Sequence, residues 1–271
     1  MNETTKPLPA EILETFGTSE GKMGSVACEA IVELPSADRS EDRAIAAVDH
    51  AIRERRATRH FAPTPVARHM VEEILDVARF APSGANTQPW RVYALGGPVR
   101  RTVSEELSRA HSSPARDSHV PEYVYYSSEM PEQQQHRRKE FGRIYYGALG
   151  IRVDDSEGRL AQTGKNYGFF GAPIGLIFTI DRRLEKGSRL DMGTFIQNVT
   201  LAAGARGLAT CPQAAFAKYH ALMRAVLEIP DEEIVVCGMS LGYAAPDAII
   251  PRMPKALVSD FAVFLGFDQE S

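Results

Sequence analysis

Two apolar segments of strand length constrain the fold of this chain more than any other feature. They read APIGLIFTI at 172–180 and EIVVCGMSLGY at 233–243. A short continuous apolar run between turn residues is typical of a buried strand. The segment at 191–210, DMGTFIQNVTLAAGARGLAT, is apolar almost all round, which predicts a helix inside a domain or at a subunit interface. These three segments together indicate a sheet covered by helices.

Helical periodicity marks two segments before residue 80. Ser40 can cap a helix whose Ile45 and Ile52 share one apolar stripe. The dipeptide Thr64-Pro65 can open the next helix, with Thr as the cap and Pro in the first position. Three more elements are expected: a strand from residue 90, a helix over 99–108 and a helix over 217–229. This order indicates an α+β domain with a central mixed sheet of four to five strands flanked by helices.

The composition is that of an ordinary globular protein. The 271 residues are 44% apolar with a net charge of −4 and no long basic run, so we expect no nucleic-acid binding. The three cysteines lie far apart without a CxxC pair, which predicts neither a zinc site nor a disulfide framework. The first residues do not resemble a secretory signal, and no apolar run reaches the about 18 residues of a membrane span. We therefore expect a cytoplasmic protein without membrane contact.

Two regions depart from the regular pattern. Residues 1–40 are rich in Glu, Ser, Thr and Pro, which predicts an N-terminal arm ahead of one domain over 41–271. Inside that domain, the stretch at about 111–146 is polar, carries several Tyr and Phe residues and has no clean periodicity. A long excursion of this kind forms a lid, a dimer contact, or a loop that its aromatic side chains hold against the body.

Three catalytic or ligand motifs fail when their context is checked. The segment GMSLG at 238–242 satisfies the serine-hydrolase pattern G-x-S-x-G, but the last histidine, His220, precedes Ser240, and no helix can start after Gly242. We therefore expect the glycines there to allow close backbone packing. The segment GRLAQTGKN at 158–166 has the wrong spacing for a phosphate loop. The seven histidines show no metal-ligand spacing.

Three separated segments supply what a phosphate-bearing heteroaromatic ligand needs. They are RERRATR at 53–59, APSGANTQPW at 81–90, and ATCPQA at 209–214 together with Arg252 and Lys255 of the tail. Arginines crowded at a helix end repel one another, and a bound phosphate would relieve that repulsion through charge-assisted hydrogen bonds. Each segment alone also fits a surface cluster or a turn. Together they match the groups that flavin mononucleotide (FMN) needs.

The order of these motifs carries a family resemblance. RRATRHF is followed about twenty residues later by APSGANTQPW, and then by FFGAPIGLIFTIDR, DMGTFIQNVTLAAGARGLATCPQ and VVCGMSLGYAAPDAIIPR. The chain resembles the FMN-dependent nitroreductase family over about residues 45–267, most of all its nitrobenzoate-reductase branch. The family's usual Ser in R-x-S-x-R is replaced by Ala57, so a hydroxyl contact to the flavin is not expected there.

The resemblance implies a nitroreductase-like fold and an obligate homodimer that holds two FMN molecules at the subunit interface, with the helix at 191–206 in the dimer core. The arginines would hold the ribityl phosphate, the loop at 82–88 the ribityl chain and ring edge, and residues 212–214 the region near the flavin N5. The implied cofactor-binding residues are Arg55, Arg56, Ala57, Arg59, Pro82, Ser83, Asn86, Gln88, Pro212, Gln213, Ala214 and Arg252.

The implied activity is reduction of nitroaromatic compounds by NADPH or NADH. Hydride would pass by a ping-pong route through the flavin N5 and give nitroso and hydroxylamine products, with no side chain acting as a nucleophile. Tyr125, Tyr145 and Phe169 are the expected wall of the substrate site. Two alternatives stay open: the same scaffold acting on an enone, quinone or halogenated aromatic, and a flavin-binding protein without turnover.

Overall fold

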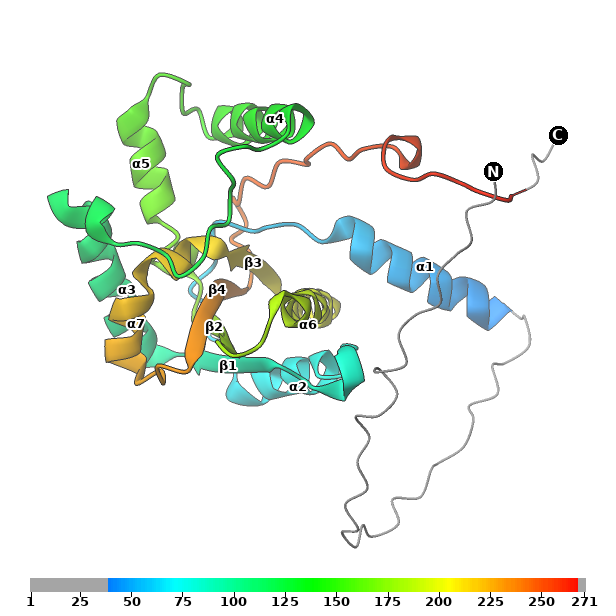
Figure 1. The fold of residues 1–271 in the computed structure, drawn as a ribbon, viewed down its shortest axis with the longest axis horizontal. Coiled ribbons are helices and arrows are strands. Elements are labelled where there is room, and N and C mark those ends of the chain that lie inside the picture. Colours follow the sequence, from blue (N-terminus) through cyan, green and yellow to red (C-terminus); the bar gives the residue numbers. More distant parts are fainter. Residues whose placement is uncertain (1–38, 268–271) are drawn as a thin grey trace, which may run out of the picture. The chain divides into compact units, whose positions relative to one another are not determined.

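The structure, a computed structural model, describes residues 39–267, so the arm predicted at 1–40 falls almost wholly outside the described residues. Residues from Ala44 onward form one compact unit. Its elements are shown in Figure 1. They are α1 (Arg39–Glu54), α2 (Arg68–Ala78), β1 (Trp90–Leu95), α3 (Gly97–Ser112), α4 (Glu132–Ala148), α5 (Ser156–Gly164), β2 (Ile174–Asp181), α6 (Lys186–Ala205), β3 (Ala209–Gln213), α7 (His220–Leu227) and β4 (Glu233–Gly242).

The four strands form one sheet in the order β1-β2-β4-β3. Every pairing between these strands is antiparallel, so the mixed sheet predicted from the sequence is wrong, although the strand number is confirmed. The helix α6 does connect two strands that run in the same direction, as expected for a crossover. However, β4 inserts between β2 and β3 and runs against both of them. The one parallel pairing is an isolated bridge between Ala57 and Thr210.

The two faces of the sheet carry separate apolar cores. Leu176 and Phe178 of β2 belong to the core that contains α2 and α6, whereas Ile177 between them belongs to the core that contains α3 and α7. This alternation follows from the two-residue period of a strand. Figure 1 shows α3 and α7 on one side of the sheet and α6 on the other. The continuous apolar runs at 172–180 and 233–243 are explained by this double burial, because both faces of β2 and β4 are covered.

Glycines allow large rings to lie flat on the sheet. A Cβ added to Gly175 would overlap the ring of Phe169, and one added to Gly238 would overlap Phe216. The two rings contact each other with their centroids 4.7 Å apart. The predicted role of the GMSLG glycines in close packing is therefore confirmed at Gly238.

The segment between α3 and α4 is held against the body by Glu122. Its carboxylate accepts hydrogen bonds from Arg182 and Arg224 at 3.0 and 3.2 Å and from the backbone N–H of Val235 at 3.3 Å. Burial acts to raise the pKa of Glu122, but the hydrogen bond from Arg182 and the nearby cations hold it below its usual value. The excursion predicted at 111–146 is thus anchored at its start and then forms the helix α4.

The start of the second helix differs from the sequence prediction. The second helix begins at Arg68 after an extended Ala67, three residues later than the predicted opening at Thr64-Pro65. The preceding segment is instead kept extended by the sheet, because Ala62 donates its N–H to the carbonyl of Tyr243 at 2.9 Å. No helix among residues 39–267 is long and apolar enough to cross a bilayer.

Candidate functional site

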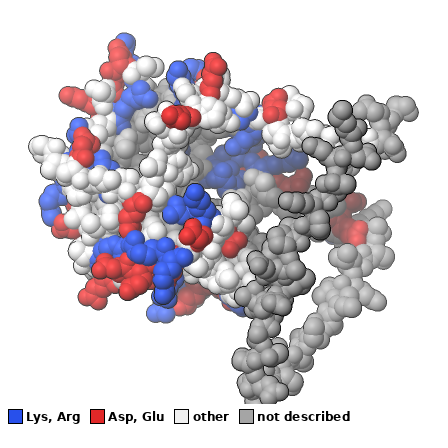
Figure 2. All heavy atoms as spheres, viewed as in Figure 1, with Lys and Arg blue, Asp and Glu red and all other residues white. Residues whose placement is uncertain are grey.

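A basic pocket of about 460 Å³ forms where the end of α1 meets the chain after β4. Figure 2 shows Lys and Arg gathered beside a hollow near the end of α1. The lining residues are Ile52, Arg53, Glu54, Arg55, Arg56, Ala57, Arg59, Phe141, Pro251, Arg252, Met253 and Lys255. Two segments almost 200 positions apart thus converge, and the arginines predicted at 55, 56, 59 and 252 lie around one cavity.

The charges of this basic pocket are only partly compensated. Glu54 pairs with Arg252 at 2.5 Å and with Arg56 at 3.1 Å. The hydrogen bond from Arg252 holds the pKa of Glu54 below its usual range. Arg55 is half-buried and makes no side-chain hydrogen bond or ion pair with any other described residue. A half-buried guanidinium without a counter-charge is unfavourable, so the pocket is suited to an anion.

Backbone pairing fixes the direction of these arginines. Thr58 donates its N–H to the carbonyl of Thr210 on β3 at 3.0 Å, and Ala57 forms the parallel bridge to the same residue. Ala57 therefore contributes its backbone to the sheet and has no hydroxyl to offer a ligand, as expected where Ala replaces the family's usual Ser. The segment after α1 is extended here, and the helix ends at Glu54 before the arginine cluster.

Arg59 links the basic pocket to a second cavity, which we call the aromatic pocket. Its guanidinium lies over the ring of Tyr145, 4.6 Å from the centroid, and near Phe141 at 5.7 Å. The aromatic pocket has a volume of about 380 Å³. It is lined by Arg59, Tyr125, Tyr126, Phe141, Tyr145, Tyr146, Gln162, Thr163, Asn166, Phe170, Pro212, Gln213, Ala214 and Ala215. An anion in one pocket and a flat ring in the other would be neighbours.

A buried chain of polar groups fixes the floor of the aromatic pocket. Ser240 is fully buried and donates its hydroxyl to the Oε1 of Gln213 at 2.7 Å. The amide of Gln213 donates to the carbonyl of Asn166 at 2.9 Å and approaches its Oδ1 at 3.2 Å. Because these buried groups satisfy one another, β3 ends with Gln213 in one fixed orientation.

Tyr145 is held in the wall of the same pocket. Gln162 donates its amide to the Tyr145 hydroxyl at 2.7 Å, and both side chains are buried. Burial raises the pKa of Tyr145, so its hydroxyl stays protonated at neutral pH. The wall of the pocket is therefore rigid, aromatic and uncharged apart from Arg59.

The loop at 82–88 lines neither of these pockets in a single chain. It is exposed and contains three non-glycine residues with left-handed backbone angles: Ala85 (φ 48°), Asn86 (φ 56°) and Gln88 (φ 47°). The N–H of Gln88 donates to the hydroxyl of Ser83 at 3.0 Å, which closes the loop on itself. Left-handed angles in non-glycine residues cost about 1 kcal/mol or more each, so a conformation like this persists mainly at functional sites.

The structure thus brings most of the sequence-predicted site residues together but leaves out the loop residues and Phe169. Pro82, Ser83, Asn86 and Gln88 lie outside both pockets. Phe169 is fully buried in the core against Phe216, so its neighbour Phe170, rather than Phe169, reaches the aromatic pocket. Asn166 and Gln162 also line the aromatic pocket, and no sequence motif marks either of them. Phe141, which lines both pockets, could have been predicted, because it is one of the aromatic residues of the stretch at 111–146.

Three other chemistries have no support among the described residues. Ser240 is fully buried and bonded to Gln213, so it is no hydrolase nucleophile. Burial raises the pKa of the Cys211 thiol to about 11 and that of Cys237 to about 12, which keeps both unreactive at neutral pH. Within residues 39–267, no three His, Cys, Asp or Glu side chains gather as metal ligands would.

Comparison with known proteins identifies the family. A sequence profile of the nitroreductase family matches residues 52–243. The chain belongs to the nitroreductase family. The 4-nitrobenzoate reductase of Pseudomonas putida is 42% identical over 225 residues, which cover 82% of this chain and 96% of that protein. The nitrobenzene nitroreductase of Ectopseudomonas oleovorans is also 42% identical, over 80% of this chain and 96% of its own length.

Solved structures of the nitroreductase family have the same fold. The FMN-dependent nitroreductase NfnB of Mycobacterium smegmatis, crystallised in complex with NADPH, superimposes with a TM-score of 0.77 at 32% identity. The alignment covers 82% of this chain and 99% of that one. The residues that line the two pockets lie within the matched region 52–243 or, for those of the tail, shortly after it.

Proposed function

We propose that this chain is an FMN-dependent oxidoreductase that uses NADPH or NADH to reduce nitroaromatic compounds to nitroso and hydroxylamine products. The relatives named above are reductases of nitrobenzoate and nitrobenzene, and they match this chain over almost their whole length. The observation that carries the proposal is the junction of the basic pocket and the aromatic pocket at Arg59. A ligand with an anionic tail and a flat polar ring fits that junction.

The residues of the basic pocket fit the phosphate of FMN. Arg55 is half-buried without a counter-charge among residues 39–267, and Arg56, Arg59 and Arg252 line the same cavity. Guanidinium–phosphate hydrogen bonds are charge-assisted and contribute about 1.5–3 kcal/mol each. We assign the ribityl phosphate to these four arginines. The backbone bridge from Ala57 to Thr210 holds the segment that carries Arg56 and Arg59 against β3.

Bound flavin supplies the hydride chemistry at its N5, and the protein supplies position and environment. Pro212, Gln213 and Ala214 line the aromatic pocket at the end of β3, and the buried contacts of Gln213 keep that edge fixed. Tyr125 and Tyr145, with Phe170 in place of Phe169, offer ring faces on which an aromatic acceptor stacks. An acceptor ring that stacks there displaces water from the reacting face.

A homodimer completes the site in this proposal. The loop at 82–88 presents amides and hydroxyls but lines neither pocket of its own chain. We propose that it reaches the flavin bound in the partner subunit, which accounts for the left-handed angles it retains while exposed. The symmetry of a two-fold dimer then gives two equal sites, each built from both chains.

Large apolar side chains that are exposed support the dimer. Along α1, Ile45 and Val48 are 64% and 58% exposed, so the predicted apolar stripe has no cover among the described residues. The tail after β4 also exposes eight large apolar side chains: Ile249, Leu257, Val258, Phe261, Val263, Phe264, Leu265 and Phe267. Exposure on this scale is typical of a protein–protein interface rather than of a monomer surface.

An anaerobic absorbance experiment tests the function. The purified protein should be yellow, lose its flavin absorbance on addition of NADPH, and regain it when nitrobenzoate is added. Protein that stays colourless after incubation with excess FMN contradicts the proposal. Parallel runs with a quinone, an enone and a halogenated aromatic rank the acceptors. Colour that never bleaches would instead indicate a flavin-binding protein without turnover.

A further inference from the structure

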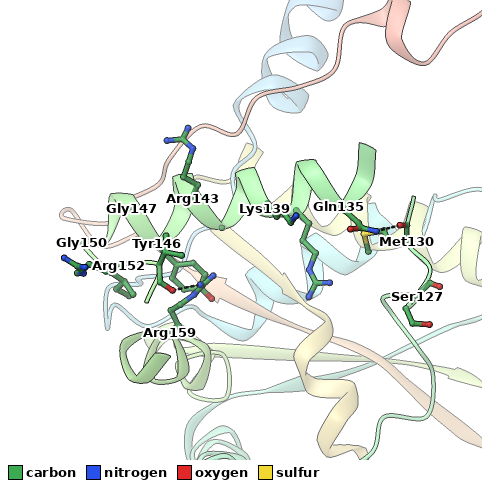
Figure 3. A pocket seen from close by; sticks show the side chains of 15 residues that line it. Ser127, Met130, Gln135, Lys139, Arg143, Tyr146, Gly147, Gly150, Arg152 and Arg159 are labelled. Atoms are coloured by element: carbon green, nitrogen blue, oxygen red, sulfur yellow. Dashed lines mark hydrogen bonds between the residues drawn. The ribbon is translucent and has the colours of Figure 1, made fainter. Parts of the chain in front are cut away.

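A further large cavity that α4 borders lies outside the two pockets described so far. It is a groove of about 1010 Å³ between α4, the turn after it and the start of α5, and we call it the α4 groove. Figure 3 shows α4 along one side of this groove, and Arg159 of α5 beside Tyr146 of α4. Ser127, Ser128 and Met130 of the excursion close one end of it.

The α4 groove is strongly cationic. Its lining contains five basic residues and no carboxylate: Arg138, Lys139, Arg143, Arg152 and Arg159. Arg143 pairs with Glu140 at 2.6 Å and Arg152 with Asp154 at 2.9 Å. Figure 3 shows that Arg143 points to the opposite side of α4 from Arg159. The other three cations have no carboxylate partner among residues 39–267.

Two of these three cations are held in place by tyrosine rings. The guanidinium of Arg138 lies 4.3 Å from the ring centroid of Tyr126, and that of Arg159 lies 4.4 Å from the centroid of Tyr146. Arg159 also donates to the carbonyl of Val153 at 3.2 Å. Guanidinium groups that stack on rings keep their N–H edges free for a planar or tetrahedral anion.

The α4 groove adjoins the aromatic pocket. Tyr146 lines both cavities, and Tyr126 of the aromatic pocket directly precedes Ser127 of the groove. A ligand that stacks in the aromatic pocket can therefore extend into the groove. An aryl carboxylate is too short to fill both, whereas a dinucleotide has a flat nicotinamide at one end and phosphates further along its length.

We propose that the α4 groove binds the 2′-phosphate of NADPH through Arg138, Lys139 and Arg159, and so sets the preference for NADPH over NADH. This inference rests on the proposed function, because it needs a nicotinamide donor in the aromatic pocket. Only NADPH carries a 2′-phosphate, and a dianionic phosphate matches three cations that lack carboxylate partners. The pyrophosphate is common to both donors and gives no discrimination.

The first test compares the two donors kinetically. The variant Arg138→Ala/Lys139→Ala should lower kcat/KM for NADPH by about tenfold or more, mainly through KM, and that for NADH by less than about twofold. Arg137 is exposed on the same helix but does not line the α4 groove, so Arg137→Ala is the matched control and should change neither value. If the double variant leaves the ratio of kcat/KM for NADPH to kcat/KM for NADH unchanged, the inference is overturned. A double variant that raises only the KM for nitrobenzoate overturns it as well.

The second test measures binding without turnover. Calorimetry of the holoenzyme at fixed salt should show that 2′,5′-ADP binds at least about tenfold more tightly than 5′-AMP, and that Arg138→Ala/Lys139→Ala removes this difference. Equal affinities for both nucleotides in the wild-type protein overturn the inference. Flavin absorbance and its bleaching by dithionite are recorded on the same samples. If the two nucleotides bind equally and the flavin signals are normal, the groove assignment fails while the proposed function stands. Protein that stays colourless with excess FMN would mean that the proposed function fails.

Discussion

The basic pocket and the loop at 82–88 both carry polar side chains predicted to hold the flavin, but only the first lines a cavity within one chain. In the basic pocket, arginines from the end of α1 and from the tail converge on one cavity, and backbone bonds to β3 fix them. The loop is exposed, keeps left-handed angles at Ala85, Asn86 and Gln88, and satisfies part of its bonding within itself. In the proposed homodimer, the basic pocket is the half of the site that one chain assembles, and the loop at 82–88 is the half that the partner subunit supplies.

The largest effect is expected in the assembled half. Arg55→Ala should weaken FMN binding by more than about tenfold, because one charge-assisted hydrogen bond contributes about 1.5–3 kcal/mol. Fluorescence titration of the apoprotein measures this affinity. Arg68→Ala is the control, since the Arg68 side chain is 91% exposed on α2, pairs with Glu72 and lies outside the basic pocket. Equal flavin affinity in Arg55→Ala and the wild type would show that the basic pocket does not hold the phosphate.

A smaller effect is expected in the exposed half. Asn86→Gly keeps the left-handed backbone and removes only the amide, so flavin affinity should fall about twofold to tenfold, the range of one neutral hydrogen bond. Ala85→Gly removes a strained side chain without removing a polar group, and should leave the affinity unchanged. If both glycine variants behave alike in the same titration, the loop makes no side-chain contact with the flavin.

The buried chain from Ser240 to Asn166 should affect stability more than chemistry. Ser240→Ala leaves the Oε1 of Gln213 without its buried donor, so the free energy of unfolding should fall by about 1–3 kcal/mol. Denaturant titration measures the loss, with the exposed Ser112→Ala as a neutral control. Activity per bound flavin should stay nearly intact. Complete loss of activity in a folded, yellow Ser240→Ala protein would require a catalytic role for the hydroxyl.

The smallest effect concerns the thiol beside the basic pocket. Because burial raises the pKa of Cys211 to about 11, only about one thiol in a thousand is ionised at pH 8. We expect no labelling of Cys211 or Cys237 by iodoacetamide in the native protein, and full labelling after denaturation. Mass spectrometry of the peptides reads this out. Rapid native labelling of Cys211 would mean that β3 opens next to the pocket.

The sheet was predictable where burial left a plain signal. The apolar runs at 172–180 and 233–243 became β2 and β4, since a strand covered on both faces has no polar side. By contrast, β3 was not predicted as a strand because ATCPQ is short and contains Pro212. The helix α4 was missed because its polar sequence, EQQQHRRKEFGRIYYGA, has no apolar stripe to reveal the helical period.

The candidate site was predictable through its charges and motifs but not through its contacts. The arginine cluster and the tail cation stand out in the sequence, and the structure places them around one cavity. Nothing in the sequence places Asn166 beside Gln213, because that contact joins segments 47 positions apart. The sequence also could not show that Phe170, and not Phe169, lines the pocket. That choice depends on the backbone, because both residues have left-handed φ angles.

A complementation experiment tests most directly whether the two halves come from different chains. Arg55→Ala/Arg59→Ala chains and Ser83→Ala/Asn86→Gly/Gln88→Ala chains carry different tags, and each should bind little FMN as a homodimer. Their purified heterodimer should recover about half of the wild-type flavin content, because one of its two sites has both halves intact. A dimer of one wild-type chain and one chain with all five substitutions should recover none. The reverse outcome, no recovery in the first and about half in the second, would contradict the account.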